Sequence, residues 1–239
     1  MLTALVLLAC VHQPPAGSST GSGAAQAHQG AHAGHGGHPG HAGHREGMTH
    51  DFNDAARFAA AFDDPKRDAW QKPTDVVALL GLRPGQAVAD LGAGTGYFLP
   101  HLLKAVAPGG AVVGLDVAEG MVAWMNARIA REGLTGAEAR KVAFDDPGLA
   151  QESVDVLLTV DTWHHVDGRE AYARKVAAGL RPGGRFVVVD FTMDSPEGPP
   201  PAFRLPPEKV LTELDAAGFD ARLVDETLPY QYVVIATRR

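Results

Sequence analysis

The sequence has a single cysteine, a deficit of basic residues and no long apolar run. A lone cysteine, Cys10, excludes a disulfide within one chain. No stretch of 18 or more apolar residues occurs, so the pattern predicts no membrane-spanning helix. Lys and Arg number 21 against 28 Asp and Glu, a formal net charge of −7, which disfavours a nucleic-acid partner. The chain has 239 residues, of which 45% are hydrophobic, and a chain of this size and composition can bury one sizeable core.

The first ten residues combine a short apolar run with the cysteine. The run LTALVLLAC, residues 2–10, has the length of the apolar part of a signal peptide, although the usual preceding basic residues are missing. Its end, LLAC at residues 7–10, resembles the lipobox of bacterial lipoproteins. The resemblance implies a signal segment over residues 1–10 and a protein held in the cell envelope through lipid on Cys10. The alternative is a misassigned start and a cytoplasmic protein.

Residues 11–47 are dominated by Gly, Ala, Ser, Pro and His, which cannot pack a core, so we expect a disordered tether. Histidine recurs there at a three-residue interval, at His32, His35, His38, His41 and His44. Neutral imidazole binds Zn, Ni and Cu(II), and a flexible chain lets several rings converge on one ion. These histidines are candidate metal ligands. The alternative is a solvated linker that binds metal only incidentally, and no metal site is expected in the folded part.

After an expected helical cap over residues 48–72, strand-like and helix-like segments alternate. The predicted strands are Ala87–Leu91, Ala111–Asp116, Ala139–Phe144, Val154–Val160, Arg185–Phe191, Arg222–Leu228 and Gln231–Thr237. The predicted helices are Asp54–Phe62, TDVVALLGL from Thr74, Phe98–Val106, Glu119–Arg131, a short one near 147–151, Arg169–Leu180 and Glu208–Ala217. Such alternation predicts an α/β fold with a mostly parallel sheet and helices on both faces.

The stretch VADLGAGTGYF, residues 88–98, is a glycine loop between a predicted strand and a predicted helix. A dinucleotide site requires Gly-x-Gly-x-x-Gly, whereas the glycines here are Gly92, Gly94 and Gly96, with Tyr97 where the third should stand. A nucleoside-triphosphate loop requires a Gly-Lys-Ser/Thr ending, and no lysine follows. The spacing therefore disfavours a nicotinamide oxidoreductase and excludes a phosphate loop of that kind.

Two acids complete the pattern, because Asp90 ends the first predicted strand and Asp116 ends the second. With VVGLD at 112–116 and LRPGGRFVVVDF at 180–191, the loop resembles the class I S-adenosylmethionine-dependent methyltransferases over about Pro73–Arg239. The resemblance implies a Rossmann-like, seven-stranded sheet whose last strand is antiparallel. It also implies a methyltransferase domain over residues 73–239 and S-adenosylmethionine as the cofactor.

The same resemblance assigns residues to the cofactor. Glycines let the backbone approach the methionine part of the ligand, and the next helix offers N–H groups to its carboxylate. Asp90 is expected to favour the ligand ammonium, and Asp116 to accept hydrogen bonds from the ribose hydroxyls or to cap the following helix. Asp145, in AFDDP, matches the family's acid near adenine or caps a turn. The expected cofactor-binding residues are Asp90, Gly92, Gly94, Gly96, Asp116 and Asp145.

The fourth predicted strand ends in VDTWHHV, residues 160–166, which is similar to the LHHV segment of the ubiquinone and menaquinone biosynthesis C-methyltransferases. Ligands of open α/β sheets bind at the carboxyl ends of strands. Asp161 and His164 are therefore candidate catalytic bases, unless they serve packing alone. Methyl transfer from a sulfonium depends mostly on alignment and exclusion of water, so a base matters only for a poor nucleophile.

The predicted function is S-adenosylmethionine-dependent methylation of a small-molecule acceptor, because the catalytic part has no inserted substrate domain. Trp70 is the aromatic residue most expected to close over that acceptor. The alternative is an envelope-tethered binding protein with a non-catalytic methyltransferase fold, whose histidine tail handles metal.

Overall fold

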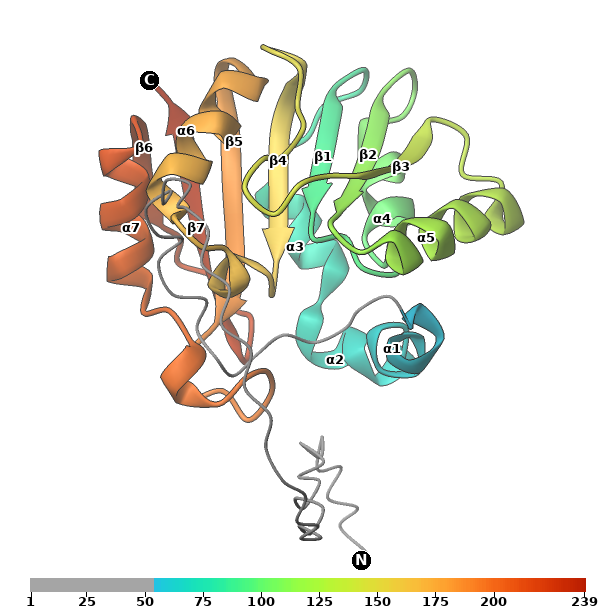
Figure 1. The fold of residues 1–239 in the computed structure, drawn as a ribbon, viewed down its shortest axis with the longest axis horizontal. Helices are drawn as coiled ribbons and strands as arrows, with labels where there is room; N and C mark the ends of the chain where they lie inside the picture. The colour runs from blue at the N-terminus through green and yellow to red at the C-terminus, as the bar shows by residue number, and fades with distance from the viewer. Residues whose placement is uncertain (1–53) are drawn as a thin grey trace, which may run out of the picture. The chain divides into compact units, whose positions relative to one another are not determined.

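The computed structural model describes residues 54–239, drawn in colour in Figure 1. The expected lipobox, the tether and the five candidate histidine ligands lie outside these residues. Within them, no helix has the length and apolar character that crossing a membrane requires. Residues 54–239 also contain no group of three or more His, Cys, Asp or Glu placed to hold a metal ion.

The core of the fold is one seven-stranded sheet in the order β3-β2-β1-β4-β5-β7-β6. The strands are β1 Ala87–Leu91, β2 Ala111–Asp116, β3 Ala137–Lys141, β4 Val154–Val160, β5 Leu180–Phe191, β6 Phe219–Leu223 and β7 Gln231–Arg238. The pairs β1–β2, β2–β3, β1–β4 and β4–β5 are parallel, whereas β7 is antiparallel to both β5 and β6. The predicted Rossmann-like sheet with an antiparallel last strand is confirmed.

Helices cover both faces of the sheet (Figure 1). One apolar cluster joins it to α3 Pro73–Leu79, α4 Leu99–Val106 and α5 Glu119–Glu132; the other joins it to α6 Arg169–Gly179 and α7 Pro207–Ala216. Alternation along a strand explains the two layers, since Val187 packs in the first cluster and Phe186 and Val188 in the second. Two-sided burial accounts for the near-continuous apolar strands.

A cap segment, residues 55–72, lies beyond the carboxyl ends of the parallel strands (Figure 1). It contains α1 Ala55–Phe62, the 3-10 turn η1 Pro65–Arg67 and α2 Asp68–Gln71. The Asp54 side chain accepts from Arg57 N and starts α1. Lys72 at φ 44° turns the chain directly into α3. The cap segment therefore lies at the edge of the sheet where ligands of such folds bind.

Four predicted elements differ from the structure. No helix forms near 147–151; Asp146 Oδ1 accepts from Gly148 N and fixes a turn, with Gly148 at φ 61°. The third strand is shorter and earlier than 139–144, because it is a largely exposed edge strand with little apolar signal. The sixth strand pairs at Phe219–Leu223 and not at 222–228. The fifth begins at Leu180, with an irregular register before Arg185.

Candidate cofactor and acceptor site

The glycine loop connects β1 to α4 and adopts backbone angles that favour glycine. Gly92, Gly94 and Gly96 have φ values of 72°, 55° and 78°. A Cβ atom at Gly92 would lie 2.3 Å from Thr162 Cγ2, and one at Gly96 would lie 2.9 Å from Leu99 Cδ1. The loop backbone therefore lies in direct contact with the segment after β4 and with the start of α4, because the three glycines have no side chains to keep it apart.

Asp116 ties the end of β2 to this loop. Its Oδ2 accepts from Gly94 N at 3.0 Å, and its Oδ1 accepts from Ala118 N at 2.9 Å at the start of α5. Burial raises the pKa of Asp116, and the backbone hydrogen bonds from Ala118, Gly94 and Val117 oppose that rise. The carboxylate thus lies at the glycine loop and just before the following helix, and its contact to the ribose hydroxyls stays a prediction.

Asp90, at the end of β1, is a carboxyl group that lacks a cation. Its residue is 2% exposed, and within residues 54–239 no Lys, Arg or His forms an ion pair with it. Burial raises the pKa of Asp90 to about 7; Arg67 opposes the rise and Asp116 adds to it. A buried carboxyl beside a bare backbone cradle fits a ligand that carries an ammonium group and a carboxylate.

Asp145 is the predicted cofactor residue that the structure does not join to the others. Its side chain is 87% exposed, and its Oδ2 lies 3.6 Å from Lys175 Nζ on α6. The neighbouring Asp146 caps the turn described above. The family match at Asp145 thus has no supporting contact among the described residues and stays a prediction.

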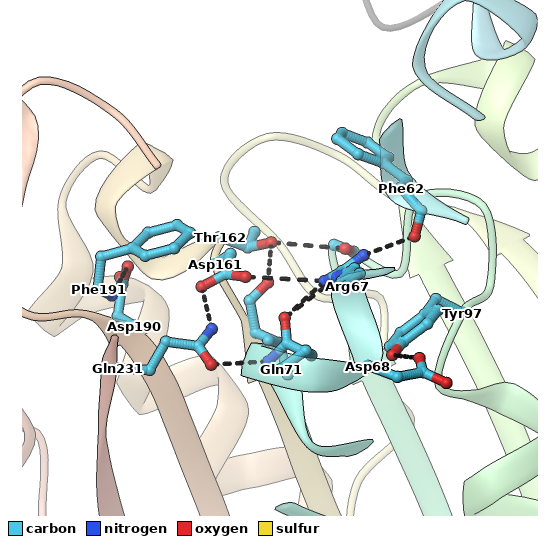
Figure 2. A network of polar contacts seen from close by, with 12 residues as sticks. Phe62, Arg67, Asp68, Gln71, Tyr97, Asp161, Thr162, Asp190, Phe191 and Gln231 are labelled. Carbon is cyan, nitrogen blue, oxygen red and sulfur yellow. Dashed lines mark hydrogen bonds and ion pairs between the residues drawn. The ribbon is translucent and has the colours of Figure 1, made fainter. Parts of the chain in front are cut away.

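Asp161 follows β4 directly, at φ 54°, and belongs to a closed ring of four polar side chains (Figure 2). Arg67 Nη2 donates to Gln71 Oε1 at 2.9 Å, and Gln71 Nε2 donates to Gln231 Oε1 at 2.8 Å. Gln231 Nε2 donates to Asp161 Oδ1 at 2.5 Å, and Asp161 Oδ2 lies 3.7 Å from Arg67 Nη2. We call Arg67, Gln71, Gln231 and Asp161 the polar ring; it joins the cap segment to β4 and β7.

Burial and the polar ring act on the pKa of Asp161 in opposite directions. Burial raises its pKa to about 7, while Arg67 and the hydrogen bond from Gln231 oppose the rise. Arg67 also donates to Phe62 O at 3.0 Å and lies with its Cζ 4.3 Å from the ring centroid of Tyr97. The Arg67 guanidinium therefore pairs with the Asp161 carboxyl after β4 and also fixes the cap segment beside the glycine loop.

His164 lies in the 3-10 turn η2, Trp163–His165, and faces Asp190 of β5. Its Nδ1 is 2.8 Å from Asp190 Oδ1, its backbone N donates to Oδ2 at 3.2 Å, and both side chains are 2% exposed. Since an ionised carboxylate only accepts, Nδ1 carries the proton and Nε2 carries the lone pair. The pair can take up a proton at Nε2.

Four residues of this arrangement were not predicted from the sequence: Arg67, Gln71, Asp190 and Gln231. Asp190 was detectable, because it stands at the carboxyl end of the fifth strand, where ligands of such sheets bind. Arg67 and Gln71 have the i, i+4 spacing of a contact along a helix. The contact between Gln71 and Gln231 joins residues 160 positions apart, and no local pattern signals it.

Comparisons with known proteins place this geometry in context. Residues 89–188 match the family model described as a methyltransferase domain. A ubiquinone/menaquinone biosynthesis C-methyltransferase of Ectopseudomonas mendocina is 30% identical over 129 residues, 52% of this chain and 48% of that protein. The nocamycin O-methyltransferase of Saccharothrix syringae is 34% identical over 146 residues, 60% of this chain and 50% of that protein. The chain thus spans about half the length of these relatives.

A solved structure has a similar fold. The crystal structure of a SAM-dependent methyltransferase from Aquifex aeolicus has a TM-score of 0.73 and 28% sequence identity to this chain. The match covers 78% of this chain and 99% of that one.

Proposed function

We propose that this chain, whose residues 89–188 match the family model described as a methyltransferase domain, transfers a methyl group from S-adenosylmethionine to a small-molecule acceptor. The observation that carries the proposal is the glycine cradle with Asp116 bonded to Gly94 N and the unpaired carboxyl of Asp90 beside it. When bound, S-adenosylmethionine supplies an electrophilic methyl group on a sulfonium. Every other part of the chemistry falls to residues of the chain.

The roles of the cofactor residues follow from their donors and acceptors. We assign the ligand ammonium to Asp90, because a cation stabilises the ionised form that burial disfavours. We assign the ribose hydroxyls to Asp116, whose oxygens keep lone pairs beyond those that accept from the backbone. Gly92, Gly94 and Gly96 provide the cradle for the methionine part.

We assign the general base to His164, with Asp190 as the positioning residue. With S-adenosylmethionine bound as the methyl donor, His164 Nε2 would take the proton that the acceptor's nucleophilic group releases. The Asp190 carboxylate, 2.8 Å from Nδ1, stabilises the imidazolium that forms. Asp161, the other base candidate, already engages Gln231 and Arg67, so its proposed part is to hold the cap segment over the reacting groups.

The test is calorimetry of the purified chain with S-adenosylmethionine, followed by an acceptor screen read out by mass spectrometry. We expect binding and the gain of one methyl group on an acceptor from the screen. His164→Gln should retain cofactor binding and lose transfer. Failure of the wild type to bind S-adenosylmethionine would refute the proposal. Binding without transfer to any acceptor would favour the alternative, a binding protein with a non-catalytic fold.

We also propose that the chain is anchored in the cell envelope through lipid on Cys10. The proposal rests on the sequence alone, on an apolar run that ends in the chain's only cysteine and is followed by residues 11–47 of Gly, Ala and His. It must meet one difficulty, because S-adenosylmethionine is made in the cytoplasm. A cytoplasmic protein with an unusual tail is the alternative.

A further inference from the structure

Three aromatic side chains from distant parts of the chain meet near His164. They are Trp70 of α2, Phe191 at the end of β5 and Tyr230 just before β7, and we call them the aromatic wall. The ring centroid of Trp70 lies 6.1 Å from that of Phe191 and 6.2 Å from that of Tyr230. Phe191 in turn lies 6.4 Å from the ring of His164. The wall therefore extends from the base to the cap segment.

The exposure of the wall distinguishes it from core packing. Trp70 and Tyr230 remain half-buried, although they contact one another and Phe191. Trp163, by contrast, is 0% exposed and packs edge-on against Phe186 in the core. Aromatic surface that stays partly open beside polar, titratable groups is typical of a ligand site.

The Phe191 side of the wall is held in place by the loop that follows β5. A Cβ atom at Gly198 would lie 2.4 Å from Phe191 Cδ2, so the loop backbone lies directly on that ring. Thr192 N donates to Tyr230 O at 3.0 Å, which fixes Tyr230 beside Phe191. A wall that needs no rearrangement binds a ligand at a lower entropic cost.

The Trp70 side is held by the polar ring. Gln71 is the next residue along α2, and its bond to Gln231 fixes α2 against the start of β7. Arg67 pairs with Asp161 and lies with its Cζ 5.8 Å from the ring centroid of Trp70. Three strand ends are thus engaged by the cap segment: β4 through Arg67, β5 through Trp70 and β7 through Gln71.

We propose that the aromatic wall binds the planar ring of an aromatic hydroxyl acceptor, and that Trp70 is a specificity-determining residue. The inference rests on the proposed function. The acceptor oxygen bonds to the methyl carbon, the carbon–sulfur bond breaks to leave a neutral thioether, and the hydroxyl proton moves to His164 Nε2. A phenolic hydroxyl, with a pKa of about 10, is within reach of an imidazole base, whereas a saturated alcohol is far more weakly acidic.

The experiment compares two probes with the same carbon skeleton on the full chain saturated with S-adenosylhomocysteine: 2-naphthol and its saturated counterpart, decahydro-2-naphthol. Ligand-observed NMR gives the dissociation constant of each. We expect the wild type to prefer 2-naphthol by about tenfold or more, since aromatic pairing adds to burial of the same area. Trp70→Leu should lose that preference, and Trp70→Phe should restore much of it. Trp124→Leu, the same change on α5 outside the wall, should keep it.

The outcomes separate this inference from the proposed function. Calorimetry with S-adenosylmethionine and thermal unfolding of each variant show whether the cofactor site and the fold are intact. No binding of 2-naphthol, equal affinity for the two probes, or an unchanged preference in Trp70→Leu would overturn the inference. Failure of the wild type to bind S-adenosylmethionine would instead refute the proposed function. Methylation of 2-naphthol, detected by mass, would support both.

Discussion

The charge of Asp90 decides how its site responds to pH. Its pKa of about 7 means that the carboxyl is neutral below that pH and ionised above it. Only the ionised form attracts an ammonium, so cofactor affinity should fall as the pH is lowered from 7 to 5.5. The fall should approach about tenfold per pH unit. Calorimetry in buffers of different ionisation enthalpy should also detect proton release on binding near pH 6.

Asp90→Asn is the control for this prediction, because other groups, the histidines among them, titrate in the same range. The variant should bind more weakly than the wild type at pH 7.5 and with little dependence on pH. A wild-type affinity that stays constant from pH 5.5 to 7.5 would contradict the assignment of the ligand ammonium to Asp90.

Asp116 and Asp145 provide a matched pair of carboxylates. Asp116→Ala removes the acceptor of Gly94 N and Ala118 N as well as the proposed ribose contact. We expect cofactor binding to weaken by about 1–3 kcal/mol. Asp145→Ala removes an exposed carboxylate beside Lys175 and should leave binding unchanged. Calorimetry measures both; a large loss in Asp145→Ala would restore its adenine role, and no loss in Asp116→Ala would exclude the ribose role.

At the scale of elements, the loop between β5 and α7 depends on one side chain. Arg204 donates to five backbone carbonyls, those of Thr192, Met193, Ser195, Glu197 and Pro199, at 2.7–3.2 Å. The loop contains the short 3-10 turn η3, Pro201–Phe203, and little other regular structure. Arg204 therefore replaces the backbone pairing that a helix or strand would supply.

Arg204→Met should leave these carbonyls without their donor and lower the free energy of unfolding by about 1–3 kcal/mol. Urea denaturation measures the change, and limited proteolysis should cut the loop faster. Arg174→Met is the matched control, because Arg174 is exposed and donates to one carbonyl, that of Ala216. It should change stability by less than about 0.5 kcal/mol. Equal stability of the two variants would show that the loop does not need Arg204.

The elements also show where prediction from the sequence succeeds. The strands β1, β2 and β4 lie within the sheet and have the predicted bounds, because burial on both faces produces continuous apolar runs. The predicted bounds of β3 and β6 were wrong. Pairing with β2 and β7 determines where these two strands begin and end, and local composition does not encode that pairing.

The candidate site divides in the same way. Asp90, Asp116 and the glycines were predictable because each stands at a fixed offset within one strand–loop–helix unit. The polar ring was not, since it forms only when residues 67 and 71 meet residues 161 and 231 in the folded chain. Contacts between distant segments depend on the tertiary fold, and a single sequence contains no signal for them.

At the scale of the whole molecule, the histidine-rich segment and the folded part should be separable. Five histidines at a three-residue interval are the candidate metal ligands, and residues 54–239 offer no cluster placed to hold a metal ion. Removal of residues 1–47 should abolish tight Ni or Zn binding and leave the affinity for S-adenosylmethionine unchanged. Calorimetry with each ligand tests this. Metal retained at full stoichiometry after truncation would locate the site elsewhere.

The location of the protein in the cell is the last question at this scale, and Cys10 decides it. If LLAC at residues 7–10 functions as a lipobox, the native protein should fractionate with membranes, and Cys10→Ser should release it. Acyl chains supply that affinity, because each buried CH₂ contributes about 0.8 kcal/mol and the serine cannot carry them as a thioether. Mass spectrometry of the native N-terminus is the independent measurement. An unprocessed N-terminus with Met1 intact, on protein recovered from the cytoplasm, would contradict the proposal and would remove the difficulty of how an exported enzyme obtains S-adenosylmethionine.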